Sequence, residues 1–98
     1  MVKERDTVRA IRTWLNSLPG CWHAKFHGNA YTDAGVPDIV GVYRGRGFAL
    51  EVKAPGRYAS AAQRRELERV GAAGGIAAVV RSVEDAARAI EAEHGGAR

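Results

Sequence analysis

The sequence lacks the features that staple or anchor many small proteins. It contains a single cysteine, Cys21, so an internal disulfide and a zinc site built only from cysteines are excluded. No stretch approaches the ~20 apolar residues that a membrane-spanning helix requires, so we expect no membrane partner. The first residues carry mixed charge with no apolar block behind them, which predicts no secretory signal and a cytoplasmic protein.

What is present is a globular composition. Of the 98 residues, 46% are hydrophobic and 27% are charged. This length suits one folded unit, so residues 1–98 are expected to form a single domain. The net charge of +4 is unevenly distributed, because residues 1–70 hold 12 basic and 7 acidic side chains. A surface that binds phosphates is therefore expected in the first two thirds of the chain.

Hydrophobic spacing predicts the secondary structure. Val8, Ile11, Leu15 and Leu18 recur at helical offsets, which is typical of an amphipathic helix that Pro19 then ends. Short β-rich runs and two further helices follow, in the order αβββαβα. The expected helices are residues 4–18, 60–70 and 82–93, and the expected strands are residues 21–27, 38–43, 48–53 and 76–80, with a polar loop at 28–37.

This order predicts an α/β fold. A strand, a helix and a strand follow one another over residues 48–80, and so short a connection returns the chain to the same sheet by a right-handed crossover. The expected result is a mixed four-stranded sheet flanked by helices, with an extra C-terminal helix. Two groups of residues receive structural roles only: Trp14, Trp22 and Phe26 as core aromatics, and Cys21, His23 and His27 as sheet residues rather than metal ligands.

Two acidic residues and a lysine are expected on one face of the predicted hairpin. If the hairpin turns at Gly45-Arg46, paired residue numbers sum to 91, and Asp38 lies opposite Lys53. Directly opposed residues share a face, and Glu51, two residues before Lys53, shares it as well. A loop one residue longer or shorter would break this arrangement unless a bulge restored it.

These three side chains are suited to phosphodiester hydrolysis. Two carboxylates within ~5–8 Å repel each other unless a divalent cation or a shared proton relieves the repulsion. Oxygen ligands favour Mg²⁺ or Mn²⁺ over zinc, and a neighbouring lysine can orient a water or stabilise charge that develops on a phosphate. The alternative is an ordinary ladder in which Glu51 and Lys53 lie on the solvent side of the strand.

Two helical residues are directed inward. Glu4 stands four residues before Val8 on the inward stripe of the first helix, and Gln63 stands four before Leu67 in the second. An acid and an amide on buried stripes need partners. The alternatives are a helix-start acid favoured by the helix dipole for Glu4, and a capping-box side chain paired with Ser60 for Gln63.

Together these motifs resemble a known nuclease family. The pattern is a leading helix with Glu4, then Gly35-Val36-Pro37-Asp38-Ile39, then Glu51-Val52-Lys53-Ala54-Pro55, then Gln63 with Leu67. It resembles the stand-alone VRR-NUC domain of the PD-(D/E)XK superfamily over roughly residues 4–80. The resemblance implies a restriction-endonuclease-like αβββαβ core.

The resemblance also implies an activity, a metal-dependent endonuclease. Small members resemble Holliday junction resolvases and are often homodimers, and the same domain forms the nuclease part of larger DNA-repair proteins. Asp38 and Glu51 would bind Mg²⁺ or Mn²⁺ together with the Val52 carbonyl. The other implied roles are activation or positioning of water for Lys53, action through metal-bound water for Glu4, and contact with the lysine or the substrate for Gln63.

Basic residues near these motifs are candidates for contacts with DNA phosphates that read no bases. They are Arg44 and Arg46 at the hairpin tip, Arg57 with Tyr58 after the lysine strand, and Arg64 on the second helix. The alternative for Arg64 is pairing with neighbouring acids on the helix surface.

The sequence therefore predicts a Mg²⁺- or Mn²⁺-dependent DNA endonuclease that acts on branched duplexes such as four-way junctions. A junction has two symmetric scissile strands, which favours a two-fold homodimer. Its interface is expected on the flank of the third strand and on residues 71–98. The alternative is a non-catalytic nucleic-acid-binding or interaction module that retains the fold. A hydrolase that uses Cys21 or a histidine has no triad-like grouping to support it.

Overall fold

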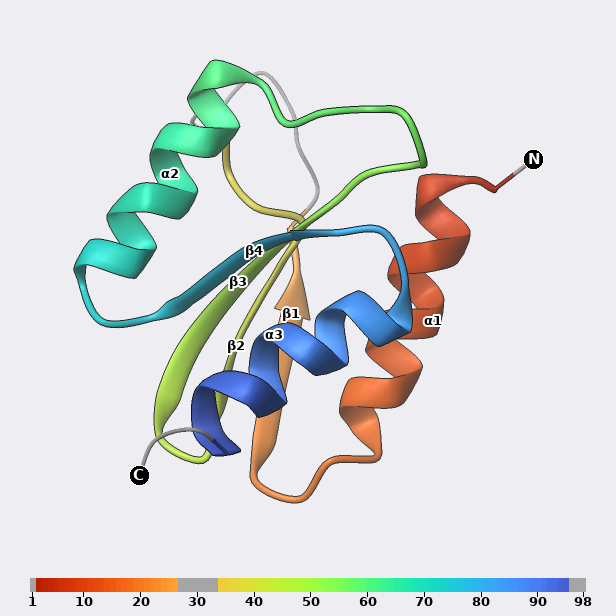
Figure 1. The fold of residues 1–98 in the computed structure, drawn as a ribbon. Coiled ribbons are helices and arrows are strands. Elements are labelled where there is room, and N and C mark those ends of the chain that lie inside the picture. The colour runs from red at the N-terminus through yellow and green to blue at the C-terminus, as the bar shows by residue number, and fades with distance from the viewer. Residues whose placement is uncertain (1, 27–33, 96–98) are drawn as a thin grey trace.

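The computed structural model describes residues 2–26 and 34–95 of the chain (Figure 1). No helix in these residues is both long and apolar enough to cross a lipid bilayer. The elements follow the predicted order αβββαβα. They are α1 (Glu4–Asn16), β1 (Cys21–Lys25), β2 (Ile39–Tyr43), β3 (Arg46–Val52), α2 (Ala61–Ala72), β4 (Ile76–Val80) and α3 (Val83–Gly95).

The strands form one four-stranded sheet in the order β1-β2-β3-β4. Neighbours among β1, β2 and β3 are antiparallel, and β4 joins β3 in parallel. α1 and α3 contact each other on one face of the sheet, whereas α2 packs over β3 and β4 on the other face (Figure 1). The predicted α/β class, with a mixed sheet flanked by helices, is confirmed.

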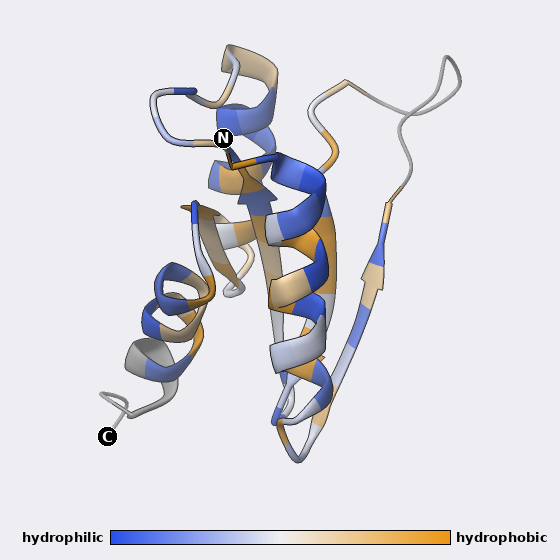
Figure 2. Cartoon of the chain, turned by 90° about the vertical axis from the view of Figure 1, so that its right-hand side faces the viewer, coloured by the Kyte–Doolittle hydropathy of each residue, from blue (hydrophilic) through white to orange (hydrophobic). Residues whose placement is uncertain are grey.

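The core lies between the sheet and the pair α1 and α3. Along β3, Phe48, Leu50 and Val52 share the face that meets these helices, and each is at most 3% exposed. Full burial of one such side chain contributes ~1.5–3 kcal/mol, so this face is a main source of stability. Hydrophilic and hydrophobic residues alternate along α1, as expected for a helix with one buried side (Figure 2). The two helices contribute Val8, Ile11, Leu15, Ala86 and Ile90 to the cluster.

The hairpin between β2 and β3 turns one residue earlier than predicted. Its two turn residues are Arg44 and Gly45, with φ of 50° and 86°, and Tyr43 pairs with Arg46. Positive φ at both central positions is typical of the tight turn that matches the twist of hairpin strands, and glycine suits the second position. Paired residue numbers therefore sum to 89 rather than 91.

The register changes the neighbour of Asp38. Ile39 pairs with Leu50, and the same register continued by one residue brings Asp38 level with Glu51. The predicted pairing of Asp38 with Lys53 is wrong. Because the shift is two residues, the alternation of side chains is preserved, and the two acids and the lysine still share the face of the sheet opposite the core.

Most elements differ from the prediction only at their ends. α1 ends at Asn16 rather than at residue 18, α3 extends to Gly95 rather than to residue 93, and β4 matches its predicted range. β1 ends at Lys25, and the predicted strand residue His27 lies outside the described residues, as does most of the loop predicted at 28–37.

Two residues predicted as core aromatics are on the surface. Trp22 is 62% exposed, Phe26 is 46% exposed, and Val42, which pairs with Trp22, is 41% exposed. They lie on the face of β1 and β2 opposite α1, and α2 packs instead over β3 and β4. The core prediction is therefore wrong for Trp22 and Phe26, whereas Trp14 packs against the core as expected.

His23 has a structural role on the other face of β1. Its Nδ1 accepts a hydrogen bond from Arg12 Nε at 3.2 Å, so its Nε2 carries the proton and donates to Asn16 Oδ1 at 2.7 Å. Burial and then the Arg12 guanidinium lower the pKa of His23, which keeps the ring neutral. His23 thus joins β1 to α1.

Candidate active site

The two predicted acids meet where β2 begins and β3 ends. Asp38 Oδ2 accepts a hydrogen bond from Val52 N at 2.8 Å. The N–H and C=O of a strand residue point to the same neighbouring strand, so the Val52 carbonyl also faces the segment that carries Asp38. The fold therefore brings together the two carboxylates and the carbonyl that the sequence predicts as metal ligands.

Glu51 is the central side chain of this group and is almost fully buried. Its side chain is 4% exposed. Its Oε2 accepts from Gln63 Nε2 at 3.0 Å and lies 3.6 Å from Lys53 Nζ. Its Oε1 is buried and accepts no hydrogen bond from residues 2–26 and 34–95. The alternative of a solvent-facing Glu51 and Lys53 ladder is wrong, because α2 covers this end of β3.

Burial and the nearby Asp38 carboxylate raise the pKa of Glu51 to about 8, and the Lys53 ammonium opposes this shift. The cause is the one expected for an acid that is desolvated beside a second acid. An ionised Glu51 is therefore unfavourable without further positive charge. Strongly perturbed acids of this kind are concentrated at functional sites.

Gln63 serves both of the roles that the sequence left open. Its backbone N donates to Ser60 Oγ at 3.1 Å, and its side-chain Oε1 accepts from Ser60 N at 2.8 Å, which is a complete capping box. The cap leaves Nε2 free to turn toward Glu51. Its partner in the structure is the acid Glu51, and the contact with the lysine or the substrate that the resemblance implies stays a prediction.

Glu4 reaches the same end of the sheet from the opposite face. Its Oε2 accepts from Ala54 N at 3.0 Å, across 50 positions of sequence. Beside this contact lies a pocket of about 570 Å³, lined in part by Glu4, Pro55 and Arg57. The inward orientation predicted for Glu4 is therefore present, and its carboxylate fixes the backbone directly after Lys53.

The donor set fits a hard divalent cation. The buried Glu51 Oε1 accepts no hydrogen bond from the part of the chain that the structure describes, and carboxylate and carbonyl oxygens are the ligands that Mg²⁺ and Mn²⁺ prefer. Within the described residues, no group of three or more His, Cys, Asp and Glu side chains is close enough to hold a metal. The protein ligands would therefore be two carboxylates, those of Asp38 and Glu51, with the Val52 carbonyl in place of a third side chain. The ion would supply positive charge to a phosphate.

Gly35 is a further residue of the site whose role was not predicted. Its φ is +84°, and a Cβ there would lie 2.4 Å from the Ala62 carbonyl oxygen and 3.0 Å from Gln63 N. The segment that leads to Asp38 thus touches the first turn of α2. The sequence shows a glycine two residues before Pro37, but the contact that requires it is with α2, which is distant in the sequence.

We expect Gly35→Ala to destabilise the fold and slow any reaction at the site. Left-handed backbone at a residue other than glycine costs ~1–3 kcal/mol, and the clash also separates Asp38 from α2. A misplacement near 1 Å can lower a rate by ~10²-fold. Urea denaturation and turnover at saturating substrate measure the two effects.

Gly74→Ala is the matched control for that variant. Gly74 has a φ of +96°, and a Cβ there meets nothing within 4 Å. This variant should show the backbone cost and keep its turnover. Equal turnover in the two variants would contradict the role assigned to Gly35.

The predicted DNA-binding residues fall into two groups. Arg57 lines the pocket beside Glu4. Tyr58 is 79% exposed and lies under the Arg81 guanidinium, 5.5 Å from it. Arg64 NH1 donates to Ala59 O at 2.7 Å, just before α2. Arg57 and Tyr58 lie on the chain that links β3 to α2, and Arg64 lies in the first turn of α2, next to Gln63.

Arg44 and Arg46 lie at the opposite end of the sheet. Five strand positions separate Arg46 from Glu51, which is a distance of ~17 Å. The Arg44 guanidinium lies over the Tyr43 ring at 5.4 Å, and Arg46 Nε donates to Gly74 O at 3.0 Å. The fold does not bring these two arginines to the carboxylate pair, and their contact with DNA stays a prediction.

The fold and the paired acids define a class: an α/β domain with a restriction-endonuclease-like core. A scan with protein-family models and a search of curated protein sequences give no match. Two solved structures are similar. One, named VRR_NUC domain protein, is 20% identical with a TM-score of 0.69 and covers 92% of this chain and 86% of its own. The other, named VRR_NUC domain, is 26% identical with a TM-score of 0.73 and covers 93% and 97%. The chain is therefore similar in fold to VRR_NUC domains over most of its length.

Proposed function

We propose that this domain is a Mg²⁺- or Mn²⁺-dependent endonuclease that hydrolyses phosphodiesters in branched DNA. The observation that carries the proposal is the buried Glu51 Oε1, which accepts no hydrogen bond from the described residues and belongs to an acid beside Asp38 with a pKa raised to about 8. Such an acid is costly unless a cation binds it. A lysine at 3.6 Å adds the charge that a phosphate at this position would need.

The neighbouring residues divide the remaining tasks. Lys53, whose side chain is 15% exposed, orients the attacking water or stabilises charge on the phosphate. Gln63 holds Glu51 by its amide. Glu4 holds the chain after Lys53 through Ala54 N. Gln63 is therefore a positioning residue for Glu51, and Glu4 is a positioning residue for Lys53.

The branched substrate follows from the family resemblance and from the basic surface. Arg57 and Tyr58 on the β3–α2 connection and Arg64 in the first turn of α2 follow Lys53 in the chain, and in this proposal they contact phosphates on either side of a scissile bond. Such contacts carry no base readout, so the proposed preference is for the shape of the substrate rather than for its sequence.

Cleavage of end-labelled DNA tests the proposal. A four-way junction, a fork and a linear duplex of the same sequence are incubated with Mg²⁺, Mn²⁺, Ca²⁺ or EDTA. We expect endonucleolytic products with Mg²⁺ or Mn²⁺, none with EDTA, and more from the junction than from the duplex. Binding of all three substrates with no cleavage in any metal would favour the alternative, a non-catalytic nucleic-acid-binding module.

We also propose that the active form is a homodimer, because paired incisions in a junction need two sites related by a two-fold axis. Trp22 is 62% exposed and Val42 is 41% exposed, and both lie on β1 and β2. The expected interface therefore includes this face as well as residues 71–98.

Light scattering at micromolar concentration should give about twice 10.5 kDa, and Trp22→Ser should shift the mass toward one chain. A wild-type monomer that makes paired cuts would contradict the dimer.

A further inference from the structure

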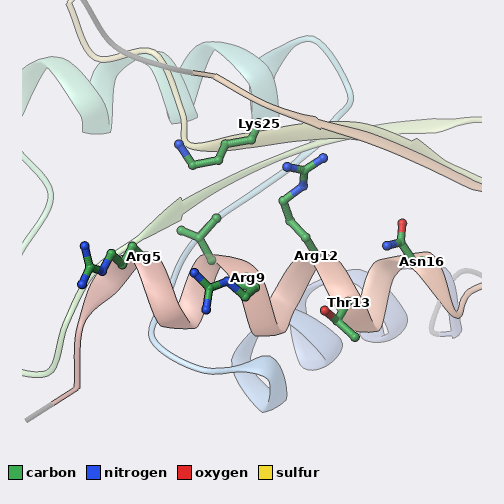
Figure 3. A pocket seen from close by; sticks show the side chains of 7 residues that line it. Arg5, Arg9, Arg12, Thr13, Asn16 and Lys25 are labelled. Atoms are coloured by element: carbon green, nitrogen blue, oxygen red, sulfur yellow. The ribbon is translucent and has the colours of Figure 1, made fainter.

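We infer that the groove between α1 and β1 binds the phosphates of one DNA strand. Four cationic side chains line it: Arg5, Arg9 and Arg12 from α1 and Lys25 from β1 (Figure 3). The groove has a volume of about 490 Å³. None of these four residues belongs to the carboxylate site or to the basic residues predicted from the sequence. The inference rests on the proposed function, because it assumes a DNA substrate.

The helix places three of these cations on one stripe. Arg5, Arg9 and Arg12 follow one another at offsets of four and three, so they lie above each other on one side of α1. Asn16 continues the stripe, and Figure 3 shows Arg12 and Asn16 extending from the helix toward the strand that carries Lys25. The groove thus has three cationic side chains on α1 and a fourth, Lys25, on the facing strand.

Little negative charge offsets these four cations. Among the described residues, no acidic side chain lines the groove. Arg9 NH1 lies 3.9 Å from Asp6 Oδ1, and both side chains are more than half exposed, so this pair is weak. Within the described residues, Lys25 Nζ donates to a carbonyl, that of Phe26, at 3.3 Å and to no carboxylate. The positive potential is therefore available to an external anion.

One cation is held in place before any ligand binds. Arg12 Nε donates to His23 Nδ1, and His23 is held in turn by Asn16. The guanidinium keeps its NH groups for a further acceptor while its direction is fixed by β1. A preorganised arginine loses less conformational entropy when it binds a phosphate.

The groove begins next to the carboxylate site at two points. Arg5 directly follows Glu4, whose carboxylate accepts from Ala54 N, directly after Lys53. Lys25 precedes Phe26, whose N donates to Asp38 O at 2.9 Å. The groove therefore lies at the same end of the sheet as the carboxylate pair but on the face that α1 covers, so a strand that leaves the pair would reach it around this end of the sheet.

The dimensions and the lining favour a sugar-phosphate backbone over a small anion or a base. Arg5 and Arg12 are seven residues apart, which is ~10.5 Å along a helix, or about three axial steps of one B-DNA strand at ~3.4 Å each. A single phosphate would use only part of this length. The described residues place no aromatic side chain in the groove, so they offer stacked bases no platform there.

Removal of two charges tests the inference. The Arg9→Gln/Lys25→Gln variant leaves Glu4 and the fixed Arg12 in place. The matched control, Arg69→Gln/Arg88→Gln, removes two charges that pair with Glu66 and Asp85 elsewhere on the surface. Binding of a fluorescent four-way junction is followed by anisotropy in EDTA from 50 to 200 mM NaCl, and cleavage is measured separately with Mg²⁺ or Mn²⁺.

The groove variant should bind about 10-fold more weakly than wild type at 100 mM NaCl, and its salt slope should fall by about 1.8, or ~0.9 for each lost phosphate contact. The control should keep the wild-type affinity and slope. Wild-type affinity and slope in the groove variant would overturn the inference, as would a wild-type protein that binds no DNA. If binding falls as expected while no protein cleaves, the groove stands and the nuclease proposal fails.

Discussion

Asp38→Asn and Glu51→Gln should each abolish DNA cleavage while leaving the fold intact. Each substitution keeps the size of the side chain and removes one of the two carboxylates that would hold the cation. In Asp38→Asn, a neutral amide replaces the carboxylate that accepts from Val52 N. In Glu51→Gln, the buried side chain can no longer ionise to hold a cation. Turnover of the labelled junction with Mg²⁺ or Mn²⁺ measures the effect, and full activity in either variant would contradict the assigned site.

The stability of Glu51→Gln provides the fold control and has a defined pH dependence. In the metal-free wild type the pKa of Glu51 is raised from 4.5 to about 8. Between these values the unfolded chain binds fewer protons than the folded one, so the free energy of unfolding falls as the pH rises. Glu51→Gln has no such ionisation. Its Tm should exceed that of wild type by a gap that widens from pH 4.5 to pH 8 and reaches ~5 °C or more.

The metal adds a second check on the same variant. Binding of Mg²⁺ or Mn²⁺ to the folded wild type should raise its Tm by mass action, and Glu51→Gln should respond much less. A Tm gap that is constant with pH would contradict the buried, uncompensated state of Glu51. A wild type and a variant that respond equally to the metal would place the ion elsewhere.

The helices and β4 were predictable because local sequence determines them. The stripe of Val8, Ile11 and Leu15 defined the buried side of α1, and the Ser60 capping box fixed the start of α2. The continuous apolar run of β4 marked a strand with helices on both sides, and α2 and α3 both contact it.

The hairpin register was less predictable because two turns were compatible with the same residues. The run Arg44-Gly45-Arg46-Gly47 offers a glycine at either position of a two-residue turn. The structure places Gly45 second and Arg44 first, with Arg44 at a φ of 50°. Sequence alternation is insensitive to a shift of two residues, so the face of the two acids was correct although their pairing was not.

The surface position of Trp22 and Phe26 could not be read from alternation. A period of two identifies residues that share a face of a strand, but it does not say which face a helix will cover. α1 covers the face that carries His23, and α2 lies over β3 and β4. Which helix covers which part of a sheet depends on the whole topology.

The candidate site was predictable in its members and not in its contacts. The spacing of Asp38, Glu51 and Lys53 indicated a shared face. The bonds from Val52 N to Asp38 and from Ala54 N to Glu4 join residues 14 and 50 positions apart. Such contacts arise from tertiary packing, and no local pattern encodes them.

Lys53→Ala should lower turnover by ~10²–10³ at saturating DNA, the range seen when one preorganised charge is removed from a transition state. Affinity for DNA should change little, because many phosphate contacts carry it. Lys53→Arg keeps the charge and should retain more activity than the alanine variant. A variant that loses binding but cleaves normally at saturation would make Lys53 a phosphate anchor instead.

The pH profile separates two ways in which Lys53 acts. The Lys53 ammonium lowers the pKa of Glu51, so its removal should raise that pKa further and protonate more of the acid near neutral pH. If this were the whole effect, raising the pH would restore the rate of Lys53→Ala to that of wild type. We expect only partial recovery, because the charge 3.6 Å from Glu51 Oε2 would also act on the phosphate. Recovery to the full wild-type rate would show that Lys53 only tunes Glu51.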